Sequence, residues 1–158
     1  MDKTPDKNKW AFGSKMESMD DAALKQRIQD AYNYEMPPLR PVPYIGNPDE
    51  IVTYDYPELI GLCPVTGIAD IYRVIIDFVP GEFLPELKTL KFYFMEYLKI
   101  PISHEHLCSK IYKEYSEQIK PKKLYVRLFT NVRGGVYNTV RLGDQSIETD
   151  IRVREVHG

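Results

Sequence analysis

Cys63 lies in a short loop whose residue types suit covalent catalysis. Residues 62–70 read Leu-Cys-Pro-Val-Thr-Gly-Ile-Ala-Asp, so a carboxylic acid, Asp70, follows the thiol by seven positions. A thiolate can add to an electron-poor carbon, and an adjacent carboxyl group can pass the proton. From this loop alone a buried structural cysteine is the commoner explanation, so residues further along the chain must decide.

Two further segments carry residues that are suited to binding. Residues 86–93, Glu-Leu-Lys-Thr-Leu-Lys-Phe-Tyr, put Lys88 and Lys91 three positions apart, on one face of a helix. Two ammonium groups near a helix start attract phosphate, although charged residues on a helix are usually its solvated face. In residues 103–106, Ser-His-Glu-His, the carboxylate of Glu105 can accept two parallel N–H bonds from an amidine edge.

With Cys63 and Asp70, these segments resemble the NADPH-dependent 7-cyano-7-deazaguanine reductases, the nitrile reductases of queuosine biosynthesis, in their short single-module form. The resemblance covers residues 47–138 and does not reach the N-terminal segment. The family signature of a glutamate, two lysines and an aromatic residue matches residues 86–93 except at Thr89. Residues 68–69, Ile-Ala, depart from the Gln-Pro that family members often carry before the aspartate.

The resemblance implies a reaction and a role for each central residue. Cys63 attacks the nitrile carbon to give a covalent thioimide, and Asp70 protonates the nitrogen. Two NADPH per nitrile then supply the hydrides that yield 7-aminomethyl-7-deazaguanine. His104 and Glu105 hold the heterocycle, and His104 takes part in proton transfer.

The resemblance also implies the residues that surround this centre. The substrate-binding residues that it adds are Pro85, Glu86 and Leu87, and the cofactor-binding residues are Lys88, Lys91 and Arg133. Pro85 is a departure, because a proline has no backbone N–H to offer a ligand. Arg133 begins an Arg-Gly-Gly sequence that, by itself, indicates a plain hairpin turn.

Zinc-ligand types occur at Cys63, His104, His106 and Cys108, but their spacing argues against a metal site. Two ligands on one helix face the same metal when they are three or four residues apart, whereas the last three of these are two apart. We therefore expect no metal, and we expect Cys108, on the apolar stripe of its helix, to lie in the core.

Hydrophobic periodicity predicts the elements that must position these residues. The expected helices span residues 20–32, 86–98 and 104–119, and the expected strands span residues 50–56, 70–79, 123–130, 136–142 and 147–156. Ser103 is the expected N-cap of the third helix. Pro37 and Pro38 end the first helix, and the prolines up to Pro43 predict an extended connector.

This order of elements predicts an α+β fold with an antiparallel sheet and two helices on one face. The resemblance implies the tunnelling fold, in which two strands, two helices and two strands follow one another and subunits assemble into rings. We therefore expect a homo-oligomer, built as one ring or as stacked rings. We expect residues 1–45 to form an N-terminal extension and residues 46–158 to form the reductase domain.

Composition excludes several classes of protein. The 158 residues suit one domain, and a formal charge of −2 gives no basic surface for nucleic acid. No apolar run approaches the ~20 residues of a membrane span, and the N-terminus lacks the apolar core of a signal peptide. Two cysteines do not make a secreted disulfide framework. We expect a cytoplasmic protein that contacts neither nucleic acid nor membrane.

Two alternative functions remain open. An amidinotransferase of archaeosine synthesis would use the same Cys63 thioimide and add ammonia in place of hydride. The two lysines of residues 86–93 and the near-neutral charge argue against it. A non-catalytic, ring-forming module that binds a purine or pterin would need Glu105 and the fold, but neither Cys63 nor the lysines.

Overall fold

The computed structural model describes residues 21–132 and 135–151, which build a four-stranded antiparallel sheet, a small second sheet and three helices. In the main sheet the strand order is β2-β3-β5-β6, with β2 Val52–Leu62, β3 Ala69–Val79, β5 Lys123–Thr130 and β6 Thr139–Gly143. The helices are α1 Asp21–Tyr32, α2 Leu87–Glu96 and α3 His104–Ile119, and the 3₁₀ turns are η1 Tyr97–Lys99 and η2 Gln145–Ile147. The small sheet pairs β1 Pro41–Pro43 with β4 Phe83–Pro85.

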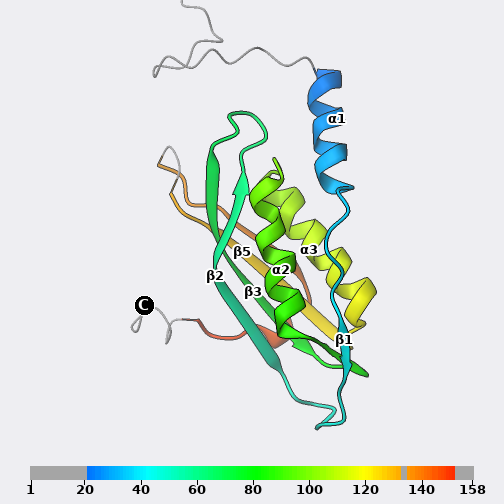
Figure 1. Cartoon of the computed structure of the whole chain (residues 1–158). Helices are drawn as coiled ribbons and strands as arrows, with labels where there is room; N and C mark the ends of the chain where they lie inside the picture. Colours follow the sequence, from blue (N-terminus) through cyan, green and yellow to red (C-terminus); the bar gives the residue numbers. More distant parts are fainter. Residues whose placement is uncertain (1–20, 133–134, 152–158) are drawn as a thin grey trace, which may run out of the picture.

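Helices α2 and α3 lie on one face of the main sheet (Figure 1). Alternation along β3 explains this packing, because Tyr72, Val74 and Ile76 share one side of the strand and are almost fully buried. The predicted α+β class with helices on one face of an antiparallel sheet is confirmed. The predicted bounds of the strand at residues 70–79 and the helix at residues 104–119 agree with β3 and α3 to within one residue.

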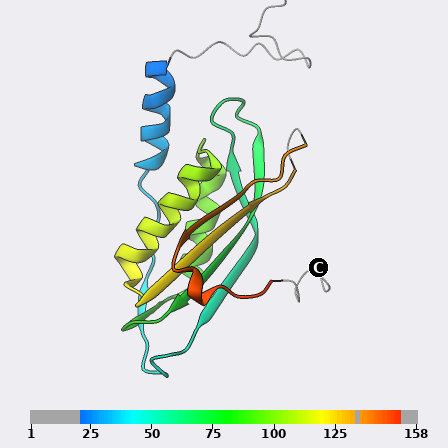
Figure 2. The same cartoon turned by 180° about the vertical axis from the view of Figure 1, so that it is seen from behind.

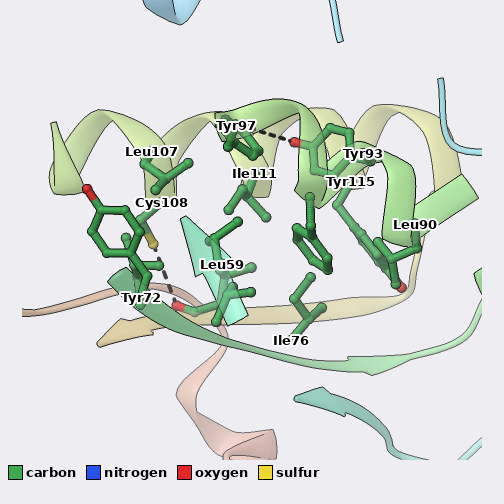
Figure 3. Close-up of a cluster of buried hydrophobic side chains, with 14 of the residues drawn as sticks. Leu59, Tyr72, Ile76, Leu90, Tyr93, Tyr97, Leu107, Cys108, Ile111 and Tyr115 are labelled. Atoms are coloured by element: carbon green, nitrogen blue, oxygen red, sulfur yellow. Dashed lines mark hydrogen bonds between the residues drawn. The ribbon is translucent and has the colours of Figure 1, made fainter. Parts of the chain in front are cut away.

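The main core fills the space between the sheet and the helices (Figure 3). Leu107, Ile111 and Tyr115 of α3 meet Leu59 and Ile76 of the sheet, and all five side chains are at most 1% exposed. Tyr72 lies at one end of this cluster, near the first turn of α3. The core is therefore continuous with the place where α3 begins.

Cys108 belongs to this core, as the apolar stripe of its helix predicted. Its side chain is fully buried, and its sulfur lies 3.9 Å from the carbonyl oxygen of Val126. Burial raises the pKa of the Cys108 thiol to about 12. The thiol is therefore protonated at neutral pH, and a thiolate nucleophile at this position is excluded.

The residues that follow β6 lie across part of the opposite face of the sheet (Figure 2). Buried Arg127 and Asp77 form an ion pair there, with 2.9 Å between Nη2 and Oδ2. Thr149 donates its N–H to Asp77 and accepts from Arg127 through its carbonyl oxygen. The predicted strand at residues 147–156 is wrong as far as Ile151, because these side-chain contacts replace strand pairing, and residues 152–156 lie outside the described part.

The N-terminal segment packs on α3. Lys110 is 2% exposed, and its ammonium group donates to the carbonyl oxygens of Tyr32 and Tyr34 at 2.8 Å each. The same group pairs with Glu114. The predicted helix at residues 20–32 is confirmed as α1. The Pro-rich connector was predicted to be extended, and its last three residues also pair with β4 as strand β1.

Other boundaries also differ from the prediction: strand β6 begins at Thr139, whereas the predicted strand began at residue 136. Strand β2 continues past the predicted end at Tyr56 through a register shift, so it reaches Leu62 and the Cys63 loop directly. Helix α2 ends at Glu96, where η1 tightens the last turn. Along residues 21–132 and 135–151, every helix is too short or too polar to reach across a bilayer.

Candidate active site

The closed end of the β2–β3 hairpin positions Cys63 and Asp70. The Cys63 N–H donates to the carbonyl oxygen of Ile68 at 2.8 Å, and the Gly67 N–H donates to that of Cys63 at 2.9 Å. Gly67 has a φ of 71°, a conformation that favours glycine. Gly61 pairs with Asp70 across the strands, so alternation puts Cys63, Gly61 and Asp70 on the face of the hairpin that meets the helices.

Tyr72 ties Asp70 to the core. Asp70 is 3% exposed, and its Oδ2 accepts a hydrogen bond from the Tyr72 hydroxyl at 3.2 Å. A Cβ atom at Gly61 would lie 3.2 Å from the Tyr72 ring, so glycine leaves room for the ring across β2. Burial raises the pKa of Tyr72 strongly, with smaller contributions from Cys63 and Glu105. Its phenol therefore stays protonated and donates to the carboxylate.

Backbone hydrogen bonds place the start of α3 beside the Cys63 loop. The Leu62 N–H donates to the carbonyl oxygen of Ile100 at 3.1 Å, and the Ile102 N–H donates to that of Leu62 at 3.0 Å. Ser103 then occupies the predicted N-cap position, although its hydroxyl lies 2.5 Å from His106 Nδ1 and makes no capping bond to the backbone. His104 and Glu105 are therefore the first two residues of α3, and they lie beside the end of the hairpin.

Asn138 fixes the orientation of the His104 ring. Its Nδ2 lies 3.2 Å from Glu105 Oε1 and 2.9 Å from His104 Nδ1. A carboxylate oxygen only accepts, so this nitrogen donates to both partners, and His104 Nδ1 is an acceptor. Neutral His104 therefore carries its proton on Nε2, which faces Asp70 Oδ2 at 3.7 Å.

Sheet pairing brings Asn138 to this place. The Asn138 N–H donates to Thr130 Oγ1, and its carbonyl oxygen accepts from the Thr130 N–H. Thr130 in turn pairs with Tyr72 on the neighbouring strand. Nothing in the sequence marked Asn138, because a single asparagine within a predicted strand is no motif. Only the pairing of the sheet with Thr130 reveals it.

The charge states of His104 and Glu105 complement each other. Burial lowers the pKa of His104, which favours the neutral imidazole. The backbone N–H of Glu105 lowers the pKa of its own carboxyl group, and the Asn138 bond lowers it further. The site therefore presents an ionised, exposed carboxylate beside a neutral imidazole that can donate or accept a proton.

Glu86 caps the N-terminus of α2 in this structure. It is the N-cap of α2, and its carboxylate accepts from the backbone N–H groups of Lys88 and Thr89 at 2.9 and 3.0 Å. These two bonds lower the pKa of Glu86. Pro85 ends β4, and Leu87 begins α2 with an exposed side chain.

Lys88 and Lys91 are exposed near the start of α2, as their spacing predicted. Lys91 and Leu87 line an open groove of about 520 Å³ between α2 and β2, together with Tyr54 and Tyr56. Of the two lysines only Lys91 lines this groove, and the carboxylates of Asp55 and Glu58 also lie on its wall. Arg133, the third predicted cofactor residue, lies outside the described residues.

The predicted residues fall into two groups within one chain. Cys63, Asp70, His104 and Glu105 come together at the hairpin end. Residues 85–88 and Lys91 lie toward the other end of α2, which rises ~1.5 Å per residue, so Glu86 is roughly 20 Å from residues 100–102. One chain does not bring the second group to the first.

The other two residues that could bind zinc, His106 and Cys108, have their side chains in contacts elsewhere. The His106 ring meets Tyr32 edge to face, with 6.4 Å between ring centroids, and Cys108 lies under α3 in the core. Within the described ranges, no three His, Cys, Asp or Glu side chains are grouped so that they hold a metal ion.

Comparison with known proteins gives consistent matches. The profile of the family described as QueF-like protein matches residues 69–149. The NADPH-dependent 7-cyano-7-deazaguanine reductase of Thermotoga petrophila is 34% identical over 96 residues, which cover 60% of this chain and 70% of that protein. The protein of the same name from Rhizobium rhizogenes is 35% identical over 115 residues, which cover 72% and 74%.

A solved structure shares the fold. The apo form of the archaeosine synthase QueF-Like aligns with a TM-score of 0.54 and covers 63% of this chain and 95% of that chain. Its sequence identity is 16%, so the likeness concerns the fold alone.

Proposed function

Because this chain belongs to the QueF-like protein family, we propose that it reduces 7-cyano-7-deazaguanine to 7-aminomethyl-7-deazaguanine with NADPH. The names of the relatives supply the substrate and the cofactor. The observation that carries the proposal is the placement of Cys63, Asp70, His104 and Glu105 at one end of the sheet, with a proton-carrying Nε2 facing a buried carboxylate.

Covalent addition is the first step that these residues support. The sulfur of Cys63 bonds to the nitrile carbon while one π bond of the nitrile opens. Asp70 takes the thiol proton and delivers it to the nitrogen, so the proton count is unchanged and a thioimide forms. The Tyr72 hydroxyl donates to the Asp70 carboxylate and holds it in place, and His104 Nε2 faces the same oxygen at 3.7 Å.

Conversion of a nitrile into an amine takes four electrons and four hydrogens, hence two hydrides and two protons. NADPH, when bound, supplies one hydride each time, so we propose two NADPH per nitrile. Lys88, Lys91 and Arg133 would hold its phosphates. Glu105 and His104 grip the ring throughout and keep water from the intermediates, which hydrolyse easily.

We further propose that a complete site takes residues from two copies of this chain. The two groups of site residues lie roughly 20 Å apart in one chain, and β2 and β6 are the edge strands of the main sheet. Edge strands expose unpaired backbone groups that pair readily with another sheet. Sheets joined side by side form the ring that the tunnelling fold builds, and Glu86 and Leu87 of one copy would face Cys63 of the next.

Replacing Lys88 or Lys91 by alanine is expected to raise the KM for NADPH roughly tenfold to a hundredfold. Each change removes one charge-assisted contact to phosphate, worth roughly 1.5–3 kcal/mol. The thioimide should still form, since that step needs no cofactor. Steady-state oxidation of NADPH at varied cofactor concentration measures the effect, and Lys99→Ala, near the other end of the same helical segment, is the matched control.

The same assay tests the alternatives. If the wild-type protein oxidises no NADPH with the nitrile present, while ammonia yields an amidine product, the reductase proposal is wrong and the amidinotransferase is right.

Mixing Lys88→Ala with a Cys63→Ala variant tests the shared site, because mixed rings contain sites that are intact at both positions. Recovery of activity on mixing, measured at an NADPH concentration well below the KM of the Lys88→Ala variant, supports sites built from two copies, and no recovery argues against them.

Replacing Asn138 by alanine is expected to weaken nitrile binding roughly tenfold. The change removes the donor that orients His104 and Glu105, and a hydrogen bond to a charged group is worth roughly 1.5–3 kcal/mol. Calorimetric titration of the nitrile in a Cys63→Ala background isolates non-covalent binding. Thr139→Ala, at an exposed position one residue further on, should bind normally, and equal affinity of both variants would show that Asn138 has no such role.

A further inference from the structure

The N-terminal segment reaches the loop that carries the candidate nucleophile. Nη1 of Arg27, on α1, donates to the carbonyl oxygen of Pro64 at 2.6 Å. Pro64 follows Cys63 directly, and its ring leaves it no N–H, so the carbonyl is its sole backbone hydrogen-bonding group. A residue outside the matched range 69–149 therefore holds the backbone next to the reacting sulfur.

Helix α1 is itself fixed to the helix that carries the rest of the site. The Lys110 ammonium group, buried in α3, binds the carbonyl oxygens at the end of α1 and just beyond it. The Tyr32 ring packs on His106, and Ala31 is 4% exposed. Figure 1 shows α1 at the same end of the molecule as the loop between β2 and β3.

These contacts make α1 a brace between two elements. At one end Lys110 anchors it to α3, which begins with His104 and Glu105. On its other side Arg27 reaches the Cys63 loop, whose residues 65–69 are exposed. The N–H donors of the bonds within this loop belong to Cys63, Thr66, Gly67 and Ile68. Arg27 therefore adds a contact from α1 to this loop, beside the backbone bonds that join Leu62 to Ile100 and Ile102 at the start of α3.

We propose that Arg27 is a positioning residue, which orients the Cys63 loop against α3 through the Pro64 carbonyl oxygen. The inference rests on the proposed function, since it gives Arg27 a role in catalysis through Cys63. Arginine suits the task because its guanidinium group stays charged and reaches far from the helix. Helix α1 then contributes to the rate of the covalent step through the loop.

Arg27→Ala tests this role against Lys25→Ala, an exposed change on the same helix, and Arg27→Lys, which keeps a cationic donor. All three substitutes are good helix formers, so α1 is preserved. Single-turnover thioimide formation, followed by intact-protein mass spectrometry, should slow roughly three- to tenfold in Arg27→Ala. The KM for NADPH should stay unchanged, Arg27→Lys should recover part of the rate, and Lys25→Ala should match the wild type.

Amide hydrogen exchange of the peptide spanning residues 61–69 supplies a readout that needs no chemistry. Exchange at Cys63 and Gly67 should be faster in Arg27→Ala than in Lys25→Ala, because the loop has lost its external support. Unchanged exchange together with an unchanged adduct rate would overturn the inference, as would an equal loss in Lys25→Ala. A wild-type protein that forms no adduct would overturn the proposed function, while the exchange comparison would still decide whether Arg27 orders the loop.

Discussion

Cys63→Ala is expected to abolish turnover and the covalent adduct while the fold stays intact. The thiol supplies the electron pair that opens the nitrile, and the methyl group of alanine cannot replace it. The second cysteine, Cys108, is buried and has its pKa raised to about 12, so it is protonated and closed to substrate. Intact-protein mass spectrometry with the nitrile should show the added mass of one substrate in the wild type and none in the variant.

The control for this experiment is Cys108→Ala, which should keep the adduct although it leaves a small gap in the core. Circular dichroism and thermal unfolding should find Cys63→Ala as well folded as the wild type, because Cys63 is only half-buried. An adduct that survives Cys63→Ala would identify a different nucleophile and would end the role proposed here for the loop.

Asp70→Asn is expected to slow thioimide formation by roughly 10²–10⁴-fold, the usual range for general acid–base help. The amide has nearly the shape of the carboxyl group and can still accept from Tyr72, so substrate should bind. It cannot carry the thiol proton to the nitrile nitrogen. Stopped-flow absorbance of the thioimide under single-turnover conditions measures the rate without NADPH.

Tyr72→Phe separates proton transfer from positioning. It removes the hydrogen bond to Asp70 Oδ2 and leaves the carboxyl group, so a loss of roughly tenfold or less is expected. If Asp70→Asn is no slower than Tyr72→Phe, Asp70 serves as a structural acceptor and another group moves the proton.

The parts of the fold that were predicted well are those with strong local periodicity. Strand β3 and helix α3 each carry a complete apolar pattern. Hydrophobic periodicity alone therefore predicts the strand at residues 70–79 and the helix at residues 104–119. The pairing of β1 with β4 joins residues 41–43 to residues 83–85, and the prolines in both give no strand pattern. The C-terminal segment is held by side chains of Asp77 and Arg127, which hydrophobic periodicity does not detect.

The candidate site divides in the same way. Cys63, Asp70, His104 and Glu105 belong to motifs along the chain. The predicted strand ended at Tyr56, however, so the extension of β2 to Leu62, which brings Cys63 beside Asp70, was not predicted. Asn138, just before β6, and Arg27, on α1, reach the same region from distant parts of the chain, so only the three-dimensional arrangement identifies them. The roles of Pro85, Glu86 and Leu87, the division at residue 45 and a cytoplasmic location stay predictions.

The burial of Cys108 makes it possible to count the accessible Cys63 thiols in a preparation with a thiol reagent. The chain has two cysteines, and only Cys63 is open to solvent in the native state. A chromogenic disulfide reagent consumes that thiol first and reaches the second only after unfolding, because a protonated thiol in a closed core does not exchange. The amount of reagent that reacts quickly therefore reports how many chains in a preparation have an accessible Cys63. Rates can then be normalised per chain with an accessible Cys63 and not per milligram of protein.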